Sequence, residues 1–371
     1  MSKGDKIQST ALRLTQPGQF ERTCIEHDVH ENDVIVEPYL ASVCHADLRY
    51  FTGSRRQDAL ESKLPMALFH EGLGIVRMSY HPKYKPGDRV VIVPSIPGYV
   101  LNNTSKNACC THCQEGGQPN YCLEGAFLGS GYDGIGQSRL VIGGDNLVLV
   151  PNELTDDIAL LAELCSVSVC AVNLKKDLQE TIQKGKKIAV FGDGPVGYLT
   201  ATTLHFIFNV PKTQLIVFGA VEEKLAEFTD FSTTHLVHDY DFQAETGVQT
   251  VLECTGGQFS SSAINQAIDL IDREGEILLM GVTEDLVPIN TRDVLEKGLT
   301  LRGSSRSTKK DFEQLMEAFK NEQFQKVLQK LVPSKAWTIH SIDDLIKAMH
   351  AASDNRGWKK TYMSFAWKNK L

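Results

Sequence analysis

The sequence predicts an α/β protein of two or three domains, in which a mainly β part precedes a doubly wound parallel sheet. Up to about Pro151, short apolar runs are separated by Gly, Pro and Asp, whereas from about Lys186 to Arg302 such runs alternate with stretches of helical period. This alternation is typical of βαβ units, whose parallel strands carry helices on both faces. The length of 371 residues agrees with this division at roughly 150 residues per domain.

Individual elements follow from the positions of the apolar runs. In the first part we expect strands at 34–37, 89–93 and 146–150. In the second part we expect parallel strands at 187–191, 214–218, 250–254, 276–280 and 299–302. The tail is predicted to contain helices at 310–321, 324–331 and 342–352 and strands at 337–340 and 361–365. Because this tail is short, it must pack on a domain formed earlier in the chain.

Composition excludes several classes of function. Hydrophobic residues make up 42% of the chain and charged residues 23%, which is usual for globular proteins and unlike disordered or coiled-coil chains. The formal net charge of −8 argues against a protein that binds nucleic acid through its phosphates.

The start lacks the apolar segment of a secretory signal, so we expect a cytoplasmic protein. Its nine cysteines are then better explained by metal binding or burial than by disulfides.

The apolar stretch 158–174 is the nearest approach to a membrane helix. It is shorter than the ~20 residues of a span, and Glu163, Ser166 and Ser168 interrupt it. We therefore expect this stretch to be buried core, without membrane insertion.

A glycine-rich loop follows the predicted strand 187–191 directly and opens an apolar helix that continues to Phe208. In such a loop the first glycine makes the turn, the second lets a pyrophosphate approach the backbone, and the third lets helix and strand pack closely. The loop predicts a Rossmann dinucleotide site, and the alternative is a purely structural turn. The predicted cofactor-binding residues here are Gly192, Gly194, Pro195, Val196 and Gly197.

The end of the next strand bears on the choice of cofactor. The acidic residue that usually binds the ribose 2′-hydroxyl is missing, because Gly219 occupies its place, and Lys224 follows a turn later. Without that carboxylate a 2′-phosphate is not repelled, which favours NADP over NAD. The alternative is that Glu222 or Glu223 reaches back to the ribose and Lys224 is a solvated charge.

Three residues of the first part, and a fourth that follows it, could hold a metal ion. Cys44 and the pair His70 and Glu71 lie in turn contexts, and Glu163 interrupts an apolar stretch. A thiolate, an imidazole and carboxylates are suitable ligands for a catalytic zinc ion. Each residue also has an ordinary structural explanation as a buried thiol, a core histidine or a carboxylate at a helix start.

In combination these motifs resemble the zinc-dependent medium-chain dehydrogenase/reductase family, which includes alcohol and sorbitol dehydrogenases, over nearly the whole chain. Within that family the sequence is most similar to the ribulose-5-phosphate reductases, or ribitol-5-phosphate dehydrogenases, which supply CDP-ribitol for the teichoic acid of bacterial cell walls. The matching stretches are 44–55, 63–72, 192–194, 262–266 and 290–307.

The resemblance implies a mainly β, GroES-like catalytic domain into which the Rossmann domain is inserted. The implied segments are 1–163 and 306–371 for the catalytic domain and 164–305 for the dinucleotide-binding domain. It also implies that Cys44, His70, Glu71 and Glu163 surround a catalytic zinc ion.

The implied reaction is hydride transfer from NADPH to ribulose 5-phosphate, which gives ribitol 5-phosphate. Alternatives are an NAD(P)-dependent polyol or sorbitol-type dehydrogenase acting on an unphosphorylated sugar alcohol, a zinc-free quinone-type reductase, and a non-catalytic NADPH-binding relative. The resemblance further implies a homodimer or homotetramer and an association with a cytidylyltransferase of the same pathway.

Two features depart from the wider family. Many alcohol dehydrogenases pass the substrate proton through two side chains whose places are taken here by Ala46 and Arg49. The proton would therefore have to leave through zinc-bound water, Glu71, Glu163 or solvent. The structural-zinc lobe also differs, because the place of its first cysteine holds Asn107.

The remaining cysteines of that lobe still form a dense group. Cys109, Cys110, Cys113 and Cys122 lie within fourteen residues, and His112 is a rival ligand. A second, structural zinc ion, an empty reduced lobe and a disulfide are the alternatives. We expect the other cysteines, Cys24, Cys165, Cys170 and Cys254, to be core thiols.

A basic run near Cys44 could bind the phosphate of a substrate. Arg49, Arg55 and Arg56 carry planar, fork-like donors that suit a phosphate, although arginines are also common in solvated loops. Arg306 is a second anion-binding candidate, for either cofactor or substrate.

Overall fold

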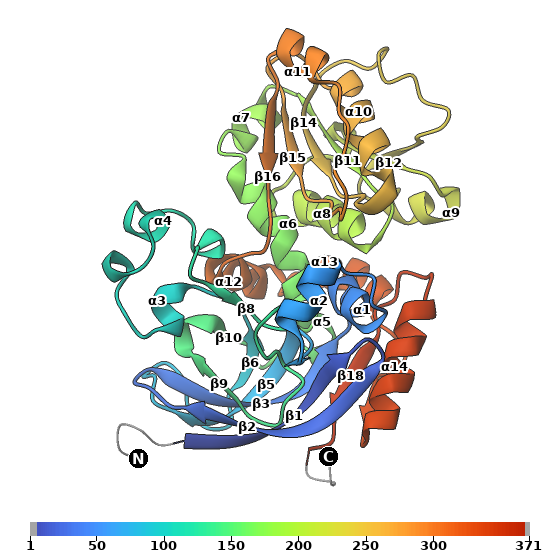
Figure 1. The fold of residues 1–371 in the computed structure, drawn as a ribbon. Coiled ribbons are helices and arrows are strands. Elements are labelled where there is room, and N and C mark those ends of the chain that lie inside the picture. The colour runs from blue at the N-terminus through green and yellow to red at the C-terminus, as the bar shows by residue number, and fades with distance from the viewer. Residues whose placement is uncertain (1–5, 368–371) are drawn as a thin grey trace. The chain divides into compact units, whose positions relative to one another are not determined.

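The computed structural model describes residues 6–367, and the chain forms two compact units (Figure 1). Unit 1 combines Met1–Glu163 with Ser307–Leu371, and unit 2 is the single segment Leu164–Arg306. The tail therefore joins the unit that the first part of the chain begins.

Unit 1 is built on a seven-stranded sheet in the order β10-β6-β5-β3-β18-β17, with β9 also paired to β3. The C-terminal strand β18 pairs antiparallel with β3, whose other neighbour on this path is β5. This pairing explains how the tail finds its surface. The strands are β3 Asp33–Ser42, β5 Glu71–Ser79, β6 Arg89–Ile92, β9 Leu140–Gly143, β10 Leu147–Leu149, β17 Trp337–Ile339 and β18 Tyr362–Phe365.

Smaller sheets and short helices complete unit 1. The sheet β2-β1-β4 contains Gln19–Asp28, Lys6–Gln16 and Met66–Ala67, and β7 Ser95–Ile96 pairs with β8 Ala126–Phe127. The helices are α1 His45–Phe51, α2 Gln57–Lys63, α3 Gly98–Leu101, α4 Thr111–Gln114, α5 Asp156–Ala159, α12 Lys309–Ala318, α13 Glu322–Leu328 and α14 Ile342–Asp354.

One hydrophobic core joins the two segments of unit 1. Val36 and Phe69 from the first segment are buried in the same cluster as Leu345 and Met363 from the tail. Burying apolar side chains in one cluster stabilises the unit by about 25 cal/mol for each Å² removed from water. The tail is thus part of the same hydrophobic core as the first segment of unit 1.

Unit 2 is a six-stranded sheet, parallel throughout, in the order β13-β12-β11-β14-β15-β16. Its strands are β11 Lys187–Phe191, β12 Leu215–Gly219, β13 Thr233–Leu236, β14 Val248–Glu253, β15 Glu276–Leu279 and β16 Thr300–Gly303. Its helices are α6 Ala162–Leu174, which begins at the end of unit 1, α7 Leu178–Gln183, α8 Pro195–Phe206, α9 Glu222–Leu225, α10 Ser260–Leu270 and α11 Thr291–Lys297.

The predicted doubly wound parallel sheet is confirmed. The chain order reverses at β11, which lies between β12 and β14, and ligands of such sheets bind at this reversal beyond the carboxyl ends of the strands. All five predicted strands form. The strand β13 was not predicted, because its sequence Thr-Thr-His-Leu is polar and only partly buried at the sheet edge.

Two expectations about buried residues have different outcomes. The stretch 158–174 is largely buried in α5 and α6, and no helix within residues 6–367 is long and apolar enough to cross a membrane. Cys165 and Cys170 are buried and Cys254 is partly buried, but the expectation for Cys24 is wrong. Cys24 is exposed because it lies on β2, the edge strand of its sheet.

Lys297 provides a test of how unit 2 is held together. Its Nζ donates to the carbonyl oxygens of Ile268, Asp269 and Ile271 at 2.7, 2.9 and 3.2 Å, at the end of α10. Lys297→Met removes these charge-assisted bonds, so we expect the free energy of unfolding to fall by about 1–2 kcal/mol. Urea denaturation measures the change, and the exposed Lys176 provides a control as Lys176→Met. Equal stability of the two variants would contradict this role of Lys297.

Candidate functional site

Asp47 organises the first group of predicted site residues. Cys44 precedes α1, and the Oδ2 atom of Asp47, in the first turn, accepts a hydrogen bond from the Cys44 backbone N–H at 2.9 Å. The Oδ1 atom accepts from the backbone N–H of Phe69 at 3.1 Å. Phe69 has a φ of 76°, a conformation that non-glycine residues seldom adopt. One fully buried carboxylate therefore fixes both segments that carry the candidate ligands.

His70 and Glu71 lie beside Cys44. The ligand atoms of these three residues are all within 4.8 Å of one another. The Nδ1 atom of His70 faces Asp47 Oδ1 at 3.7 Å, which leaves Nε2 for a metal ion. Burial alone would lower the pKa of His70, but Asp47 and Cys44 raise it well above its ordinary value. The imidazole thus lies in a strongly negative environment.

Lys360 enters the same site from the tail. Its Nζ donates to Glu71 Oε1 and to the carbonyl oxygen of Val43, both at 2.9 Å. Burial would raise the pKa of Glu71, but Lys360 and His70 lower it below its usual value. The Glu71 carboxylate is therefore held in its ionised form.

Glu163 is buried near this group without belonging to the close set of three. It lies in the first turn of α6 and is 5% exposed. Burial raises the pKa of Glu163 to about 7, although the charge of His70 acts in the opposite direction. Burial therefore favours the protonated form of Glu163, whereas Lys360 favours the ionised form of Glu71.

This donor set fits zinc. A thiol sulfur, an imidazole nitrogen and a carboxylate oxygen are brought together in a buried site, and a second carboxylate is close enough to affect the same imidazole. Zinc accepts all three donor types, and its histidine ligands commonly have a carboxylate near their other ring nitrogen, as His70 has Asp47 at 3.7 Å.

The cysteine lobe forms a second potential metal site. The sulfur atoms of Cys109, Cys110, Cys113 and Cys122 lie within 4.8 Å of one another and all four are buried. All are free thiols. The backbone N–H of Cys113 lowers the pKa of Cys110 to about 6, which favours a thiolate. Cys109 thus occupies the fourth position that Asn107 cannot fill.

The rival ligand His112 turns away from this group. Its Nε2 atom lies 3.0 Å from the carbonyl oxygen of Gln118, and the contact is exposed. The lobe therefore offers four sulfur donors and no imidazole, which is a common composition of structural zinc sites.

The glycine loop of unit 2 has the close packing that a dinucleotide site requires. Gly192 has a φ of 130°, and a Cβ added at Gly197 would lie 2.0 Å from the Gly192 carbonyl oxygen. A Cβ added at Gly194 would meet nothing within 4 Å, so this position is open to a ligand. Pro195 and Val196 begin α8, whose N-terminus can receive a phosphate. These features fit a bound pyrophosphate.

The other predicted cofactor residues lie at different places in unit 2. Gly219 ends β12, Lys224 lies in α9, and Arg306 ends the unit with a φ of 63°. As expected, no acidic residue ends β12, but a carboxylate from elsewhere in the chain lies there. Asp193 of the glycine loop places its carboxylate there, because β11 and β12 are neighbouring strands.

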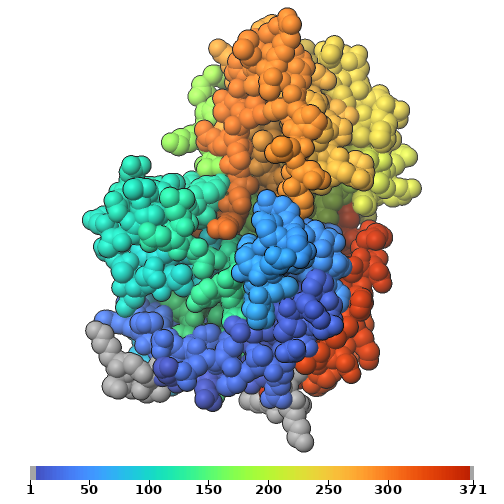
Figure 2. Space-filling view, in the orientation of Figure 1, coloured from blue at the N-terminus to red at the C-terminus, as the bar shows by residue number. Residues whose placement is uncertain are grey.

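The three arginines of the basic run lie in and between the first two helices of unit 1. Arg49 lies in α1, and Arg56 directly precedes α2, where its Nε is 4.0 Å from an exposed Asp58 carboxylate. Arg55 stacks on the buried ring of Tyr50, with its guanidinium carbon 5.0 Å from the ring centroid. Figure 2 shows this helical segment, in mid-blue, at the surface of unit 1. The contact with Tyr50 holds the guanidinium of Arg55 in place.

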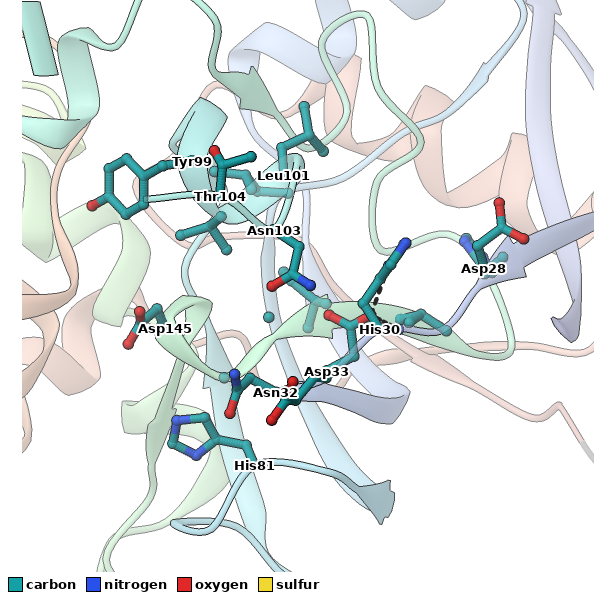
Figure 3. Close-up of a pocket in the computed structure, with 18 of the residues that line it drawn as sticks. Asp28, His30, Asn32, Asp33, His81, Tyr99, Leu101, Asn103, Thr104 and Asp145 are labelled. Carbon is teal, nitrogen blue, oxygen red and sulfur yellow. Dashed lines mark hydrogen bonds and ion pairs between the residues drawn. The ribbon is translucent and has the colours of Figure 1, made fainter. Parts of the chain in front are cut away.

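A polar cavity of about 570 Å³ lies elsewhere in unit 1. Figure 3 shows carboxylates and imidazoles along its wall, including Asp33 and His30, whose backbone N–H donates to Asp33 at 2.7 Å. None of the predicted catalytic, metal or phosphate residues lines it. The predicted sites therefore do not coincide with this cavity.

Two family models match the chain. Residues 30–152 match the alcohol dehydrogenase GroES-like domain, and residues 195–321 match the zinc-binding dehydrogenase family. Ribulose-5-phosphate reductase 1 of Staphylococcus aureus is 36% identical over 355 residues, which cover 95% of this chain and 98% of the relative. The chain belongs to the ribulose-5-phosphate reductase family.

Two further proteins are similar to this chain over nearly its whole length. The enzyme of that name from Bacillus spizizenii is 34% identical and covers 95% of this chain and 98% of its own length. The crystal structure of S. aureus TarJ in complex with NADPH superimposes with a TM-score of 0.79 at 32% identity, covering 97% of this chain and 99% of that one. The predicted resemblance and the GroES-like and Rossmann fold class are confirmed.

Two residues that contact the group of Cys44, His70 and Glu71 were not identified from the sequence. Asp47 could have been found, because it follows Cys44 by three residues, the spacing at which a carboxylate can reach back to a helix start. Lys360 had no such signal, since it is 289 residues from Glu71 along the chain.

The close set of donors leads to a first prediction for the site. Cys44→Ser and His70→Ala each weaken the ligand shell, so we expect zinc content to fall and turnover to fall about 100-fold or more. Metal analysis and steady-state kinetics measure the two effects. Cys24→Ser, at an exposed thiol, should change neither. Full activity of metal-depleted wild-type protein would contradict the prediction.

The cysteine lobe leads to a different expectation. Cys113→Ser should lower the melting temperature, with a loss of several kcal/mol if the lobe binds zinc, because a structural site contributes folding free energy. Activity per folded molecule should stay within about twofold, since the lobe is separate from Cys44 and its neighbours. A single zinc ion per chain in fully active protein would be evidence against the second site.

Proposed function

We propose that this protein is a zinc-dependent ribulose-5-phosphate reductase, which uses NADPH to reduce ribulose 5-phosphate to ribitol 5-phosphate. The observation that carries the proposal is full-length similarity at 34–36% identity to proteins of that name, combined with the buried group Cys44, His70 and Glu71. The product would enter CDP-ribitol synthesis for teichoic acid.

The residues that would hold the two cofactors lie in different units. Cys44, His70, Glu71 and Glu163 of unit 1 would surround zinc, and the glycine loop, Gly219, Lys224 and Arg306 of unit 2 would meet NADPH. When bound, these groups supply a Lewis acid for a carbonyl oxygen and a hydride for its carbon. TarJ, at 32% identity, binds NADPH in its crystal structure, which supports this choice of dinucleotide.

The protein's own side chains prepare the site for a polar reaction. Asp47 fixes the backbone segments that carry Cys44 and His70, and Lys360 compensates the charge of Glu71. Burial of these groups excludes water and strengthens every charge interaction among them. Because Ala46 has no hydroxyl and Lys360 already donates to Glu71, we assign the exchange of the substrate proton to the buried carboxylate of Glu163.

Assembly and location complete the proposal. A homodimer or homotetramer is supported by the exposed edge strand β16 and by two exposed side chains near it in sequence, Leu286 and Leu295, which are 100% and 79% exposed. We place the enzyme in the cytoplasm, in association with a cytidylyltransferase that consumes its product. The cysteine lobe would hold the second zinc ion.

The phosphate of the substrate separates this function from its main alternative, a polyol dehydrogenase for unphosphorylated sugars. Arg55 is the strongest candidate for binding it, because stacking on Tyr50 holds its guanidinium in place. Phosphate binding remote from the carbonyl would position the sugar for reaction. Wild-type protein should therefore prefer ribulose 5-phosphate to ribulose.

A cycle of two proteins and two substrates tests this contact. Arg55→Ala should lower kcat/KM for ribulose 5-phosphate but leave that for ribulose nearly unchanged, with a coupling of about 1.5–3 kcal/mol. Arg77→Ala, at an exposed arginine paired with Glu37, is the control. Equal losses on both substrates would show that Arg55 supports the loop instead. Equal wild-type activity on both would favour the polyol dehydrogenase.

A further inference from the structure

The carboxylate of Asp193, in the glycine loop of unit 2, lies at the end of the neighbouring strand β12. The Oδ2 atom of Asp193 accepts hydrogen bonds from the backbone N–H groups of Ala220 and Val221 at 2.7 and 2.8 Å. These two residues directly follow Gly219, the last residue of β12. The negative charge of Asp193 therefore lies at the end of the second strand of the sheet.

The absence of a side chain at Gly219 is what makes this arrangement possible. A Cβ built on Gly219 would lie 2.7 Å from Asp193 Cβ and 2.9 Å from its Oδ2. Real Cβ atoms do not approach other atoms so closely, so any larger residue at position 219 would push the Asp193 side chain away. The glycine at 219 and the aspartate at 193 thus form one matched pair.

The position at the end of the second strand has a known consequence in parallel sheets of this order. A dinucleotide lies across the carboxyl ends of the strands, and an acidic residue ending the second strand accepts from the adenosine ribose 2′-hydroxyl. Such a carboxylate repels the 2′-phosphate of NADP. Here a carboxylate occupies that region, but it comes from the first glycine turn.

We propose that Asp193 is a specificity-determining residue for the dinucleotide, and that its charge limits how strongly NADPH is preferred to NADH. The proposal rests on the proposed function, since that function supplies the two nucleotides. The preference for a 2′-phosphate is set by the balance between this carboxylate and cations such as Lys224. Glu222 and Glu223, which also follow β12, would have little part in it.

Binding of the nucleotides alone tests this assignment, without substrate or turnover. Dissociation constants for NADPH and NADH are measured from nucleotide fluorescence for wild type and for Asp193→Asn, whose amide oxygen can still accept from both N–H groups. We expect the preference for NADPH over NADH to increase about tenfold in Asp193→Asn, because a partly solvated charge near the 2′-phosphate is removed. An unchanged preference would overturn the proposal.

Three further carboxylates make the test specific. Asp230→Asn removes an equal charge near the amino end of β12, where β13 starts beside Ile216, and it should leave the preference unchanged. Glu222→Gln and Glu223→Gln should change it by less than about twofold. If either of these glutamate variants shifts the preference while Asp193→Asn does not, the ribose is bound by α9 and the proposal is wrong.

A second variant approaches the same contact from β12. Gly219→Ala displaces Asp193, so its effect and that of Asp193→Asn should not add, and the double variant should stay within about twofold of Asp193→Asn. Additive effects would overturn the proposal. Wild-type protein that binds NADH but not NADPH would contradict the proposed function. In that case, measurable NADPH binding by Asp193→Asn would still support the role of Asp193, and its absence would overturn it.

Discussion

The burial of several acidic groups in one small volume is the constraint on which the site and its surroundings depend. Asp47, Glu71 and Glu163 are each at most 5% exposed. Ionised carboxylates are costly at such depth unless hydrogen bonds and cations compensate them. Backbone N–H groups stabilise Asp47, and Lys360 compensates Glu71. A divalent ion among the donors would compensate the remaining charge, so metal binding and stability of this region are expected to be linked.

The order of strands in unit 1 makes this compensation available. Glu71 begins β5, β3 lies between β5 and β18, and Lys360 comes just before β18. The tail therefore contributes both apolar side chains to the core and a lysine that contacts Glu71. The first segment of unit 1 thus carries the four candidate ligands, and the tail supplies the cation that compensates Glu71.

In unit 2 the decisive feature is the absence of side chains at particular glycines. At Gly197 the helix α8 lies so near to Gly192 that no side chain fits between them, and at Gly194 the backbone is open. The same lack of a side chain at Gly219 admits the Asp193 carboxylate. Glycine therefore allows close packing at position 197, leaves the backbone open at position 194 and makes space for a neighbouring charge at position 219.

The sequence by itself determined the parallel strands of unit 2, the glycine loop and the residues Cys44, His70 and Glu71 as candidate ligands, because apolar runs and short motifs express local chemistry. Only the tertiary structure decided which distant groups come into contact and which residues stay exposed. Lys360 contacts Glu71, Asp193 contacts the residues that follow β12, and Cys24 is exposed. All three are results of strand pairing. Pairing joins residues far apart in the chain, and no local pattern specifies it.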